Sequence, residues 1–449
     1  MTSRSAKFSG IALTALAMAV ALSGCNTINH FRNKDDGPVA VASQGQRISI
    51  VAFEQKLEPS KSLKGVGYYL PPVQPVADWP TGSGPAGDLI QNADSAKAFS
   101  IAWVKQIGAA SKQETEVVAQ PVSDGHLIYV LDGQARVSAF DVNSGNEVWS
   151  RDLNPHLKRE KVGFGGGLAV DGGKLYVTSG YRFIKALDAA SGKELWSKTV
   201  DTPLHSPPTP ANGMVFVTDV DNQIFAFDQG TGEMVWTYQA IAEPARILKA
   251  SAPLVADGTI YAPFSSGEIV ALTATKGEPT WDQVLAQSSR TNALSEIRDI
   301  SGRPVIYRGD VYAVSHSGMM AAIDMRTGTQ RWTLPVTSTT TPWPAGDVVF
   351  VSDTVGRVIC ASRDNGQIYW ITDLNHGKRK KDRGVWSGPT LSGPNLVLVS
   401  SLGEAVALNP KTGAVQRTLK LGSDALMTPI AVGDNLYVAT QAAELIAIR

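Results

Sequence analysis

The stretch SGKELW, residues 191–196, decides the fold, because variants of it recur along the whole chain. Five further copies place a Trp four residues after a turn glycine, and they end at Trp149, Trp236, Trp281, Trp332 and Trp370. An isolated Trp103 precedes them, and an eighth copy, TGAVQR, has Arg417 in the Trp position. Successive positions are 38 to 51 residues apart. A period of that size predicts a fold of stacked or radial repeats.

The sequence around each Trp repeats as well. A turn of the Asp-Gly or Asn-Gly type begins the apolar alternation in DGHLIYVLD, DGGKLYVTS, NGMVFVTDV and DGTIYAPFS, and a second alternating run such as RVSAFD or QIFAFD follows. Period-two alternation bounded by turn residues predicts strands. With the Trp strand and one strand ahead of the turn (GGLAV, SAPLV, RPVIY), each unit has four strands, which is typical of a propeller blade. We therefore predict an all-β fold: an eight-bladed β-propeller of four-stranded antiparallel blades.

The last unit, GDNLYVATQAAELIAIR, ends at Arg449 without its Trp strand. The missing strand is available at the other end of the array, in FSIAWVKQIG around Trp103. Pairing of this N-terminal strand with the C-terminal blade would remove the exposed edges of an open array, so we predict that it closes the ring.

The repeated Trp has a predicted packing role. A blade cannot bury both of its faces alone, and a large flat side chain on its outer strand fills the gap to the neighbouring blade. Burial of about 150–250 Å² of aromatic surface at ~25 cal/mol per Å² stabilises each joint by at most about 4–6 kcal/mol. The structural set comprises Trp103, Trp149, Trp196, Trp236, Trp281, Trp332 and Trp370. Four acidic residues stand four positions before the turn glycine, where a short acceptor can bind turn amides: Asp141, Asp188, Asp228 and Asp324.

The N-terminus has the pattern of an export signal. Arg4 and Lys7 precede a short apolar run, residues 11–20, which is too short to span a membrane as a helix. The following LSGC resembles a bacterial lipobox, which predicts lipidation of Cys25 and anchoring in the inner leaflet of the outer membrane, on its periplasmic face. Asn26, rather than Asp, follows the cysteine, as the sorting rule for the outer membrane requires.

Three segments follow from these patterns. Residues 1–24 are predicted to be a lipoprotein signal peptide, residues 25–95 a lipidated cysteine with a Pro/Gly-rich tether, and residues 96–449 the propeller. Within the tether RISIVAF, residues 47–53, has strand-like alternation and is expected either to dock or to be loosely ordered. Lys plus Arg and Asp plus Glu number 41 each, so charge gives no reason to expect nucleic-acid binding.

Residues that carry chemistry are sparse. The six His residues are scattered without metal-ligand spacing, and neither a nucleophile elbow nor a phosphate-binding loop is present. Asp219 and Asp221 resemble a calcium-binding fragment but lack further oxygen ligands, which favours a role in a hairpin turn. Cys360 is predicted to be a buried free thiol. We therefore predict no catalytic residue, no metal and no cofactor.

The Trp repeat resembles that of the quinoprotein dehydrogenases, whose eight-bladed propellers hold pyrroloquinoline quinone. This chain lacks the adjacent Cys–Cys pair of those enzymes, which favours a packing role for the motif over cofactor binding. An exported quinone-dependent oxidoreductase is the alternative function. The combination of lipobox, proline-rich segment and eight Trp-motif blades resembles the BamB family, the lipoprotein propellers of the outer-membrane β-barrel assembly machinery. That resemblance implies a non-enzymatic scaffold that binds the periplasmic domains of BamA, contacts other subunits and assists insertion of outer-membrane proteins, with binding of the unfolded clients as a further possibility. A propeller that binds another envelope component is a further alternative.

The resemblance also implies partner-contacting residues. The family uses a Leu-x-Leu-Arg stretch before a Ser-Ala-Pro, and an Asp-x-Asp pair in the next connector between blades. Gapless matching places Ile247 on the second Leu and Leu248 on the Arg, whereas a shift by one residue places Lys249 on the Arg. Asp299 matches the first Asp, and Ser301 replaces the second. Alternatively, Ile247 and Leu248 merely begin a buried strand.

Four long connectors are predicted to lie on one face of the ring and to carry binding: 153–167, 241–250, 285–303 and 374–388. The last contains a dense basic run, Lys378, Arg379, Lys380, Lys381 and Arg383, which is either a solvated loop or a contact for an acidic surface or lipid headgroups.

Overall fold

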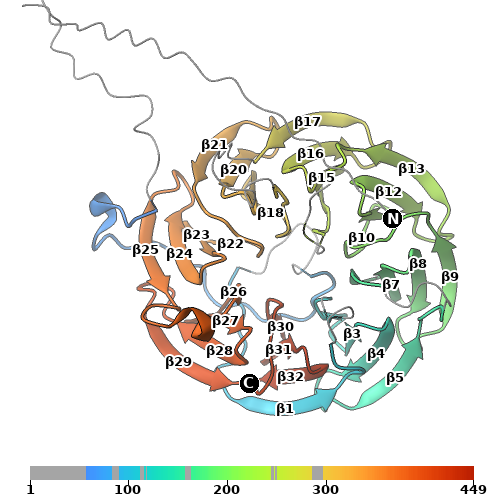
Figure 1. Cartoon of the computed structure of the whole chain (residues 1–449), viewed down its shortest axis with the longest axis horizontal. Coiled ribbons are helices and arrows are strands. Elements are labelled where there is room, and N and C mark those ends of the chain that lie inside the picture. Colours follow the sequence, from blue (N-terminus) through green and yellow to red (C-terminus); the bar gives the residue numbers. More distant parts are fainter. Residues whose placement is uncertain are drawn as a thin grey trace, which may run out of the picture. The chain divides into compact units, whose positions relative to one another are not determined.

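A computed structural model describes residues 57–82, 91–111, 116–117, 119–156, 163–243, 247, 250–285 and 297–449. Eight four-stranded antiparallel sheets succeed one another around a ring, and each sheet is one blade (Figure 1). The predicted all-β, eight-bladed propeller is therefore confirmed. Cys25, the predicted signal peptide of residues 1–24 and the segment 47–53 lie outside the described residues.

The blades are numbered along the chain, and the strands of each are given from the axis outward. Blades 1 to 4 are β2 (Val122–Ser123), β3 (Leu127–Leu131), β4 (Arg136–Asp141) and β5 (Glu147–Asp152); β6 (Gly166–Asp171), β7 (Lys174–Ser179), β8 (Phe183–Asp188) and β9 (Glu194–Thr199); β10 (Thr209–Ala211), β11 (Met214–Thr218), β12 (Gln223–Asp228) and β13 (Met234–Gln239); β14 (Leu254–Ala256), β15 (Thr259–Pro263), β16 (Glu268–Thr273) and β17 (Pro279–Val284).

Blades 5 to 8 continue the same order. They are β18 (Val305–Tyr307), β19 (Asp310–Val314), β20 (Met320–Asp324) and β21 (Gln330–Leu334); β22 (Trp343–Ala345), β23 (Val348–Ser352), β24 (Arg357–Ser362) and β25 (Ile368–Asp373); β26 (Trp386–Ser392), β27 (Asn395–Ser400), β28 (Glu404–Leu408) and β29 (Val415–Lys420); β30 (Ile430–Val432), β31 (Asn435–Ala439), β32 (Glu444–Ile448) and β1 (Ile101–Gln106). Two short 3₁₀ turns are η2 (Lys61–Leu63) and η4 (Lys380–Asp382).

Burial follows from this stacking. The second and third strands of each blade are covered on both faces by neighbouring blades, and strands such as β19 and β23 are buried at every residue. Outer strands such as β13 and β17 alternate between exposed and half-buried residues, because only one of their faces meets the next blade. This difference explains why the inner strands are nearly continuous apolar runs.

The ring closes as predicted from the two ends of the chain. Strand β1 pairs antiparallel with β32, with Trp103 opposite Ala447, and so becomes the outer strand of blade 8. Backbone hydrogen bonds between Ser100 and Arg449 fasten the two ends further. Because β1 supplies the fourth strand, blade 8 has four strands like the other seven blades.

Each blade Trp lies in the joint between its own blade and the next. Trp196 packs against Tyr176 of its own blade, with ring centroids 6.0 Å apart, and its Nε1 donates to the carbonyl of Gln229 in blade 3 at 3.3 Å. The face of its ring covers Gly232, where an added Cβ would stand 2.6 Å from Trp196 Cε3. The same glycine contact recurs under Trp103, Trp149, Trp236, Trp281, Trp332 and Trp370. Glycine is therefore needed at this turn for two reasons: its backbone has a positive φ, and the indole that covers it leaves no space for a Cβ.

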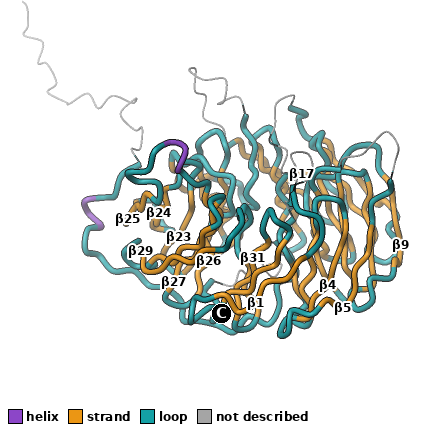
Figure 2. Tube along the Cα trace, turned by 60° about the horizontal axis from the view of Figure 1, so that its bottom comes forward, coloured by secondary structure: helices purple, strands orange, loops and turns teal. Residues whose placement is uncertain are grey.

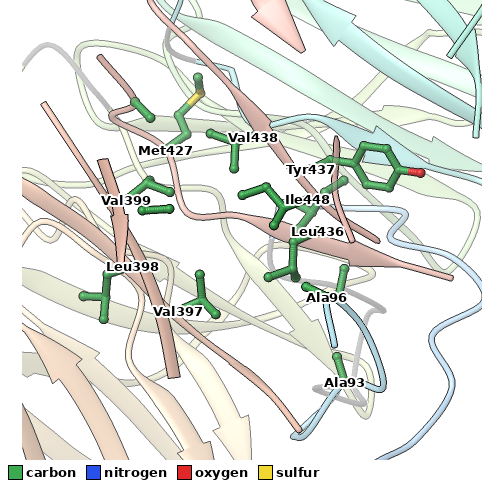
Figure 3. Close-up of a cluster of buried hydrophobic side chains, with 14 of the residues drawn as sticks. Ala93, Ala96, Val397, Leu398, Val399, Met427, Leu436, Tyr437, Val438 and Ile448 are labelled. Carbon is green, nitrogen blue, oxygen red and sulfur yellow. The ribbon is translucent and has the colours of Figure 1, made fainter. Parts of the chain in front are cut away.

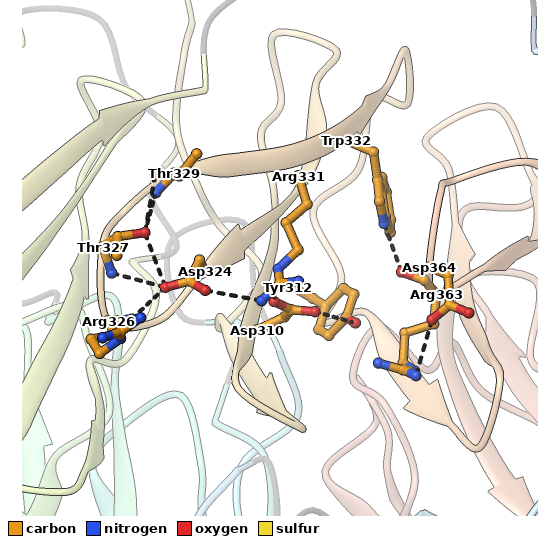
Figure 4. Close-up of polar contacts among 10 residues, drawn as sticks. All are labelled: Asp310, Tyr312, Asp324, Arg326, Thr327, Thr329, Arg331, Trp332, Arg363 and Asp364. Atoms are coloured by element: carbon orange, nitrogen blue, oxygen red, sulfur yellow. Dashed lines mark hydrogen bonds and ion pairs between the residues drawn. The ribbon is translucent and has the colours of Figure 1, made fainter.

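The acidic residue before each of these turns accepts hydrogen bonds from the backbone amides of the turn. Asp324 Oδ1 accepts hydrogen bonds from the amides of Arg326 and Thr327 and from the Thr327 hydroxyl, as Figure 4 shows. At the joint between blade 5 and blade 6, Trp332 Nε1 donates to the Arg363 carbonyl at 2.7 Å. Amide donors lower the pKa of Asp141, Asp188, Asp228 and Asp324, with the Ser191 hydroxyl as the first cause at Asp188.

Arg417 replaces Trp because its joint differs. Blade 8 has no turn between its third and fourth strands, since the chain ends at Arg449 and β1 begins elsewhere. No turn glycine is available there to receive an indole. Arg417 Nη1 instead donates to the carbonyls of Lys97 and Ala98, at 3.4 and 3.1 Å, in the segment that leads into β1.

The segment before β1 packs on the propeller more extensively than a tether ending at residue 95 implies. The compact unit begins at Glu54, and we call residues 57–82 and 91–100 the N-terminal arm. Trp79 is 1% exposed and stacks on Trp343 of blade 6, with centroids 6.3 Å apart. Figure 3 shows Ala93 and Ala96 of the arm within the buried cluster of blades 7 and 8. The prolines of this segment set an extended path, and its aromatic and small side chains provide the contacts.

Tyr68 of the arm completes one of the Trp joints. Trp370 Nε1 donates to the Tyr68 hydroxyl at 2.9 Å, and that hydroxyl donates to the Pro410 carbonyl of blade 7 at 2.5 Å. In other joints, such as those of Trp196, Trp236 and Trp332, the indole donates directly to the equivalent carbonyl. Cys360 is buried beside this hydroxyl, and its burial raises the pKa of the thiol. The arm is thus built into the joint between blades 6 and 7.

Candidate functional site

The two faces of the ring are built from different loops. Because strand direction alternates within a blade, the links from each outer strand to the next blade share one face with the hairpins between second and third strands; we call it the connector face. The opposite turn face carries the tight turns. In Figure 2 the loop with η4, which links β25 to β26, lies along the upper side of the ring.

The described part of the arm follows the turn face. The amide of Asp347, in the tight turn of blade 6, donates to the Tyr69 carbonyl at 3.1 Å, and Gly433, in the tight turn of blade 8, donates to Val76 at 2.8 Å. Trp79 pairs with Ser123 at the tight turn of blade 1. The arm therefore contacts the turn face at blades 6, 8 and 1, and the long connectors lie on the other face.

Two of the predicted partner-contacting residues meet on the connector face. The carboxylate of Asp299, in the link from blade 4 to blade 5, accepts a hydrogen bond from the Ile247 amide, in the link from blade 3 to blade 4. Ile247 is half-buried and precedes β14, which begins at Leu254, so it belongs to the connector and does not begin a buried strand. Asp299 is 5% exposed. Leu248 and Lys249 lie outside the described residues.

Ser301 lies elsewhere. It is 3% exposed and lines a cavity at the axis of the ring, so it is not on the outer surface of the connector face. Its neighbour Asp299 also fixes the hairpin of blade 5, since its carbonyl accepts a hydrogen bond from the His316 amide at 2.8 Å. Asp299 therefore ties together two adjacent links and one hairpin, whereas Ser301 faces the axis.

The basic run is partly engaged within its own loop. Arg379 pairs with Asp382 at 2.8 Å, Lys378 lies 5.6 Å from the centre of the Trp386 ring, and the Arg383 side chain donates to a backbone carbonyl of the same loop. Lys380 and Lys381 are exposed within η4. These two lysines present positive charge on the connector face.

Groups suited to metal binding are not gathered in the part of the chain that the structure describes: no three His, Cys, Asp or Glu side chains are placed to share an ion. Asp219 Oδ1 accepts the amides of Asp221 and Gln223, which is the hairpin-turn role expected for this pair. Burial raises the pKa of Asp219. Among the described helices, none has the length and apolar character needed to cross a membrane.

Three residues that make long-range contacts have no recognisable motif in the sequence. Tyr68 and Trp79 belong to a proline-rich stretch outside the repeat, where the presence of large aromatic residues is the only signal of docking. Arg303, just before β18, is 6% exposed and faces the axis of the ring. No local pattern distinguishes it from a surface arginine.

Comparison with known proteins agrees with this architecture. Residues 133–372 match the family model described as outer membrane protein assembly factor BamB. The BamB of Burkholderia pseudomallei is 28% identical over 341 residues, which covers 76% of this chain and 85% of that protein. The BamB of Moranella endobia is 27% identical and covers 73% of this chain and 84% of its own length.

Solved structures share the fold at lower identity. The crystal structure of BamB from Moraxella catarrhalis superposes with a TM-score of 0.66 at 20% identity, covering 77% of this chain and 99% of that one. A europium-containing methanol dehydrogenase also gives a TM-score of 0.66, at 17% identity, covering 81% and 89%. The fold alone therefore does not separate a BamB protein from a dehydrogenase, but the family model spans more than half of the chain. The chain belongs to the family of the outer membrane protein assembly factor BamB.

Proposed function

We propose that this protein is a non-enzymatic scaffold of the outer-membrane β-barrel assembly machinery that binds the periplasmic domains of BamA through its connector face. Family membership supports a role in outer-membrane protein assembly. Lipidation of Cys25 after removal of residues 1–24 would hold the propeller at the periplasmic face of the outer membrane.

The observation that carries the proposed contact is the hydrogen bond from the Ile247 amide to the Asp299 carboxylate. Because Asp299 is buried, its role in this proposal is to hold the connector that bears Ile247, Leu248 and Lys249, and those three side chains meet the partner. An apolar pair followed by a cation suits a partner surface with an apolar groove beside a carboxylate. Ser301 lines the axial cavity and takes no part in this contact.

The two faces of one blade provide a matched test. Lys249→Glu reverses a charge on the proposed contact, and Lys276→Glu makes the same change in an exposed tight turn of blade 4, on the turn face. Purified wild type and variants are used to recover proteins from a detergent extract of the cell envelope. We expect recovery of BamA to fall about tenfold with Lys249→Glu, as for loss of one interface residue worth ~1.4 kcal/mol. Lys276→Glu should recover as much as wild type.

A second pair separates contact from positioning. Leu248→Ala removes a contacting side chain, whereas Asp299→Ala releases the Ile247 amide, so both are expected to reduce recovery while leaving the melting temperature within a few degrees of wild type. Undiminished recovery with the Leu248→Ala and Asp299→Ala double variant would move the contact to another part of the ring. Recovery of a different envelope protein by wild type would favour the alternative of another partner.

The quinoprotein alternative has its own readout. An oxidoreductase of that class would bind pyrroloquinoline quinone with calcium and acquire the absorption of the bound quinone. For the scaffold we expect the visible spectrum of the purified chain to equal the sum of protein and free quinone. A saturable spectral change on adding both ligands would contradict the non-enzymatic proposal.

A further inference from the structure

A small cavity lies at the axis of the ring. It has a volume of about 80 Å³ and is lined by residues from all eight blades and by Thr81 and Gly82 of the arm. At ~15 Å³ of such volume per water molecule, the space holds roughly five waters or one small solute. Its polar lining includes Ser251, Ser301, Arg303 and Thr340.

Arg303 enters this cavity as a buried cation with an incomplete set of partners. Its Nη1 donates to the Thr81 hydroxyl at 2.6 Å. Among the described residues, neither its Nε nor its Nη2 has a hydrogen-bond partner, although both atoms are shielded from solvent. The hydroxyls of Ser251 and Ser301 are likewise buried without partners, and both residues line the same cavity. These four unsatisfied donors thus belong to three residues that line the same cavity.

The unsatisfied atoms of Arg303 have a specific geometry. Nε and Nη2 project their N–H groups in parallel from one edge of the planar guanidinium, and this edge matches the two oxygens of a carboxylate. Burial lowers the pKa of Arg303 to about 10, so the group is still charged at neutral pH. A buried charge that lacks a counter-ion is strongly destabilising, and each unmade hydrogen bond adds to that cost.

We infer that the axial cavity binds a small carboxylate anion, paired bidentately with the Nε–Nη2 edge of Arg303 and hydrogen-bonded by the hydroxyls of Ser251 and Ser301. The cavity volume of about 80 Å³ suits an anion of about the size of formate or acetate. Because Arg303 also contacts Thr81, the bound anion would stabilise the attachment of the arm to the ring. This site is independent of the proposed contact on the connector face.

Thermal unfolding of the purified full chain tests this inference. Sodium formate or acetate is titrated at constant ionic strength against sodium chloride, in a buffer free of other carboxylates. Ligand that binds only the folded chain raises its melting temperature, and we expect a saturable rise of about 2–4 °C near 100-fold Kd. Calorimetric titration should give one site per chain. Bidentate pairing should favour the carboxylate over chloride by about tenfold.

Two methionine variants locate the effect. Arg303→Met removes the cation and should abolish the carboxylate-dependent rise, while its own melting temperature without carboxylate is no lower than that of wild type, because an unpaired buried charge has been removed. Arg326→Met makes the same change at an exposed turn position of blade 5 and should respond as wild type does. Ser301→Ala should weaken binding about tenfold or less by removing one hydroxyl donor.

Several results would overturn the inference. An equal rise in melting temperature for wild type and Arg303→Met would show a general salt effect. If wild type gives neither heat nor a shift in melting temperature at any carboxylate concentration up to the molar range, no carboxylate binds. Equal affinity for chloride would exclude carboxylate recognition. If Arg303→Met does not fold, Arg303→Lys retains the charge without the fork, and unchanged carboxylate affinity in that variant would refute bidentate pairing.

Discussion

Replacing Gly232 with alanine tests how neighbouring blades are joined. Gly232 has a φ of +72° and lies against the face of Trp196, whereas Gly213, in another turn of the same blade, has a φ of +76° and open space around it. The two glycines therefore share one backbone requirement and differ in the indole. Gly213→Ala serves as the matched control for Gly232→Ala.

The magnitudes follow from the two sets of neighbours. An L-residue with left-handed backbone angles costs about 1–2 kcal/mol, and both variants incur this cost. At Gly232 the new Cβ would also stand 2.6 Å from Trp196 Cε3 and 2.7 Å from Cδ2, so the ring or the blade has to shift. Overpacking of this kind costs about 1–3 kcal/mol more. We expect destabilisation by about 2–5 kcal/mol for Gly232→Ala and about 1–2 kcal/mol for Gly213→Ala.

Equilibrium unfolding in urea gives the free energies of unfolding. The transition is followed by circular dichroism, because Trp fluorescence would differ between wild type and the Trp variants. Trp196→Ala alone should cost about 3–5 kcal/mol. In the Trp196→Ala background the cost of Gly232→Ala should fall to that of Gly213→Ala, which gives a coupling of about 1–3 kcal/mol. Equal costs for the two glycine variants in the wild-type background, or additive costs for Trp196→Ala and Gly232→Ala, would refute the packing argument.

Three further predictions concern the arm and the turns. Tyr68→Phe removes the hydroxyl that links blades 6 and 7 and should lower the free energy of unfolding by about 1–3 kcal/mol, whereas Tyr69→Phe, at a 52% exposed side chain, should change it by less than ~0.5 kcal/mol. Deletion of residues 57–82 should lower the melting temperature, because it uncovers apolar surface on the turn face; an unchanged melting curve would contradict arm docking. Because hydrogen bonds from the Thr231 amide and hydroxyl lower the pKa of Asp228 in the folded chain, its stabilising effect is complete above the unfolded pKa of about 3.9 and is lost as the pH falls through the lower folded value. Asp228→Asn should therefore lose less stability than wild type between pH 4 and pH 2, measured by thermal melts, and identical pH profiles would argue against this linkage.

Much of the site could not be predicted from sequence. Matching of a short motif brought together Ile247 and Asp299, which the structure places in hydrogen-bond contact. The same matching included Ser301 because it stands two positions after Asp299, but Ser301 lines the axial cavity, whereas the carboxylate of Asp299 binds the amide of Ile247. Motif spacing carries no information about which of these residues faces the axis and which faces the connector.

The sequence by itself determined the number of blades, their four strands and the closure of the ring, because period-two alternation, turn glycines and a repeated Trp are local signals that report local structure. It also showed that Arg417 departs from the pattern, but only the structure gave the reason, which is the missing turn where the chain ends meet.

Tertiary structure alone decided the rest. Thr81 meets Arg303 across 222 residues of sequence, and Tyr68 meets Trp370 across 302. Contacts at such separations leave no periodic trace, since each is made once and depends on the path that the arm takes over a ring already formed. The buried arginine at the axis and the arm that reaches it are therefore properties of the closed ring.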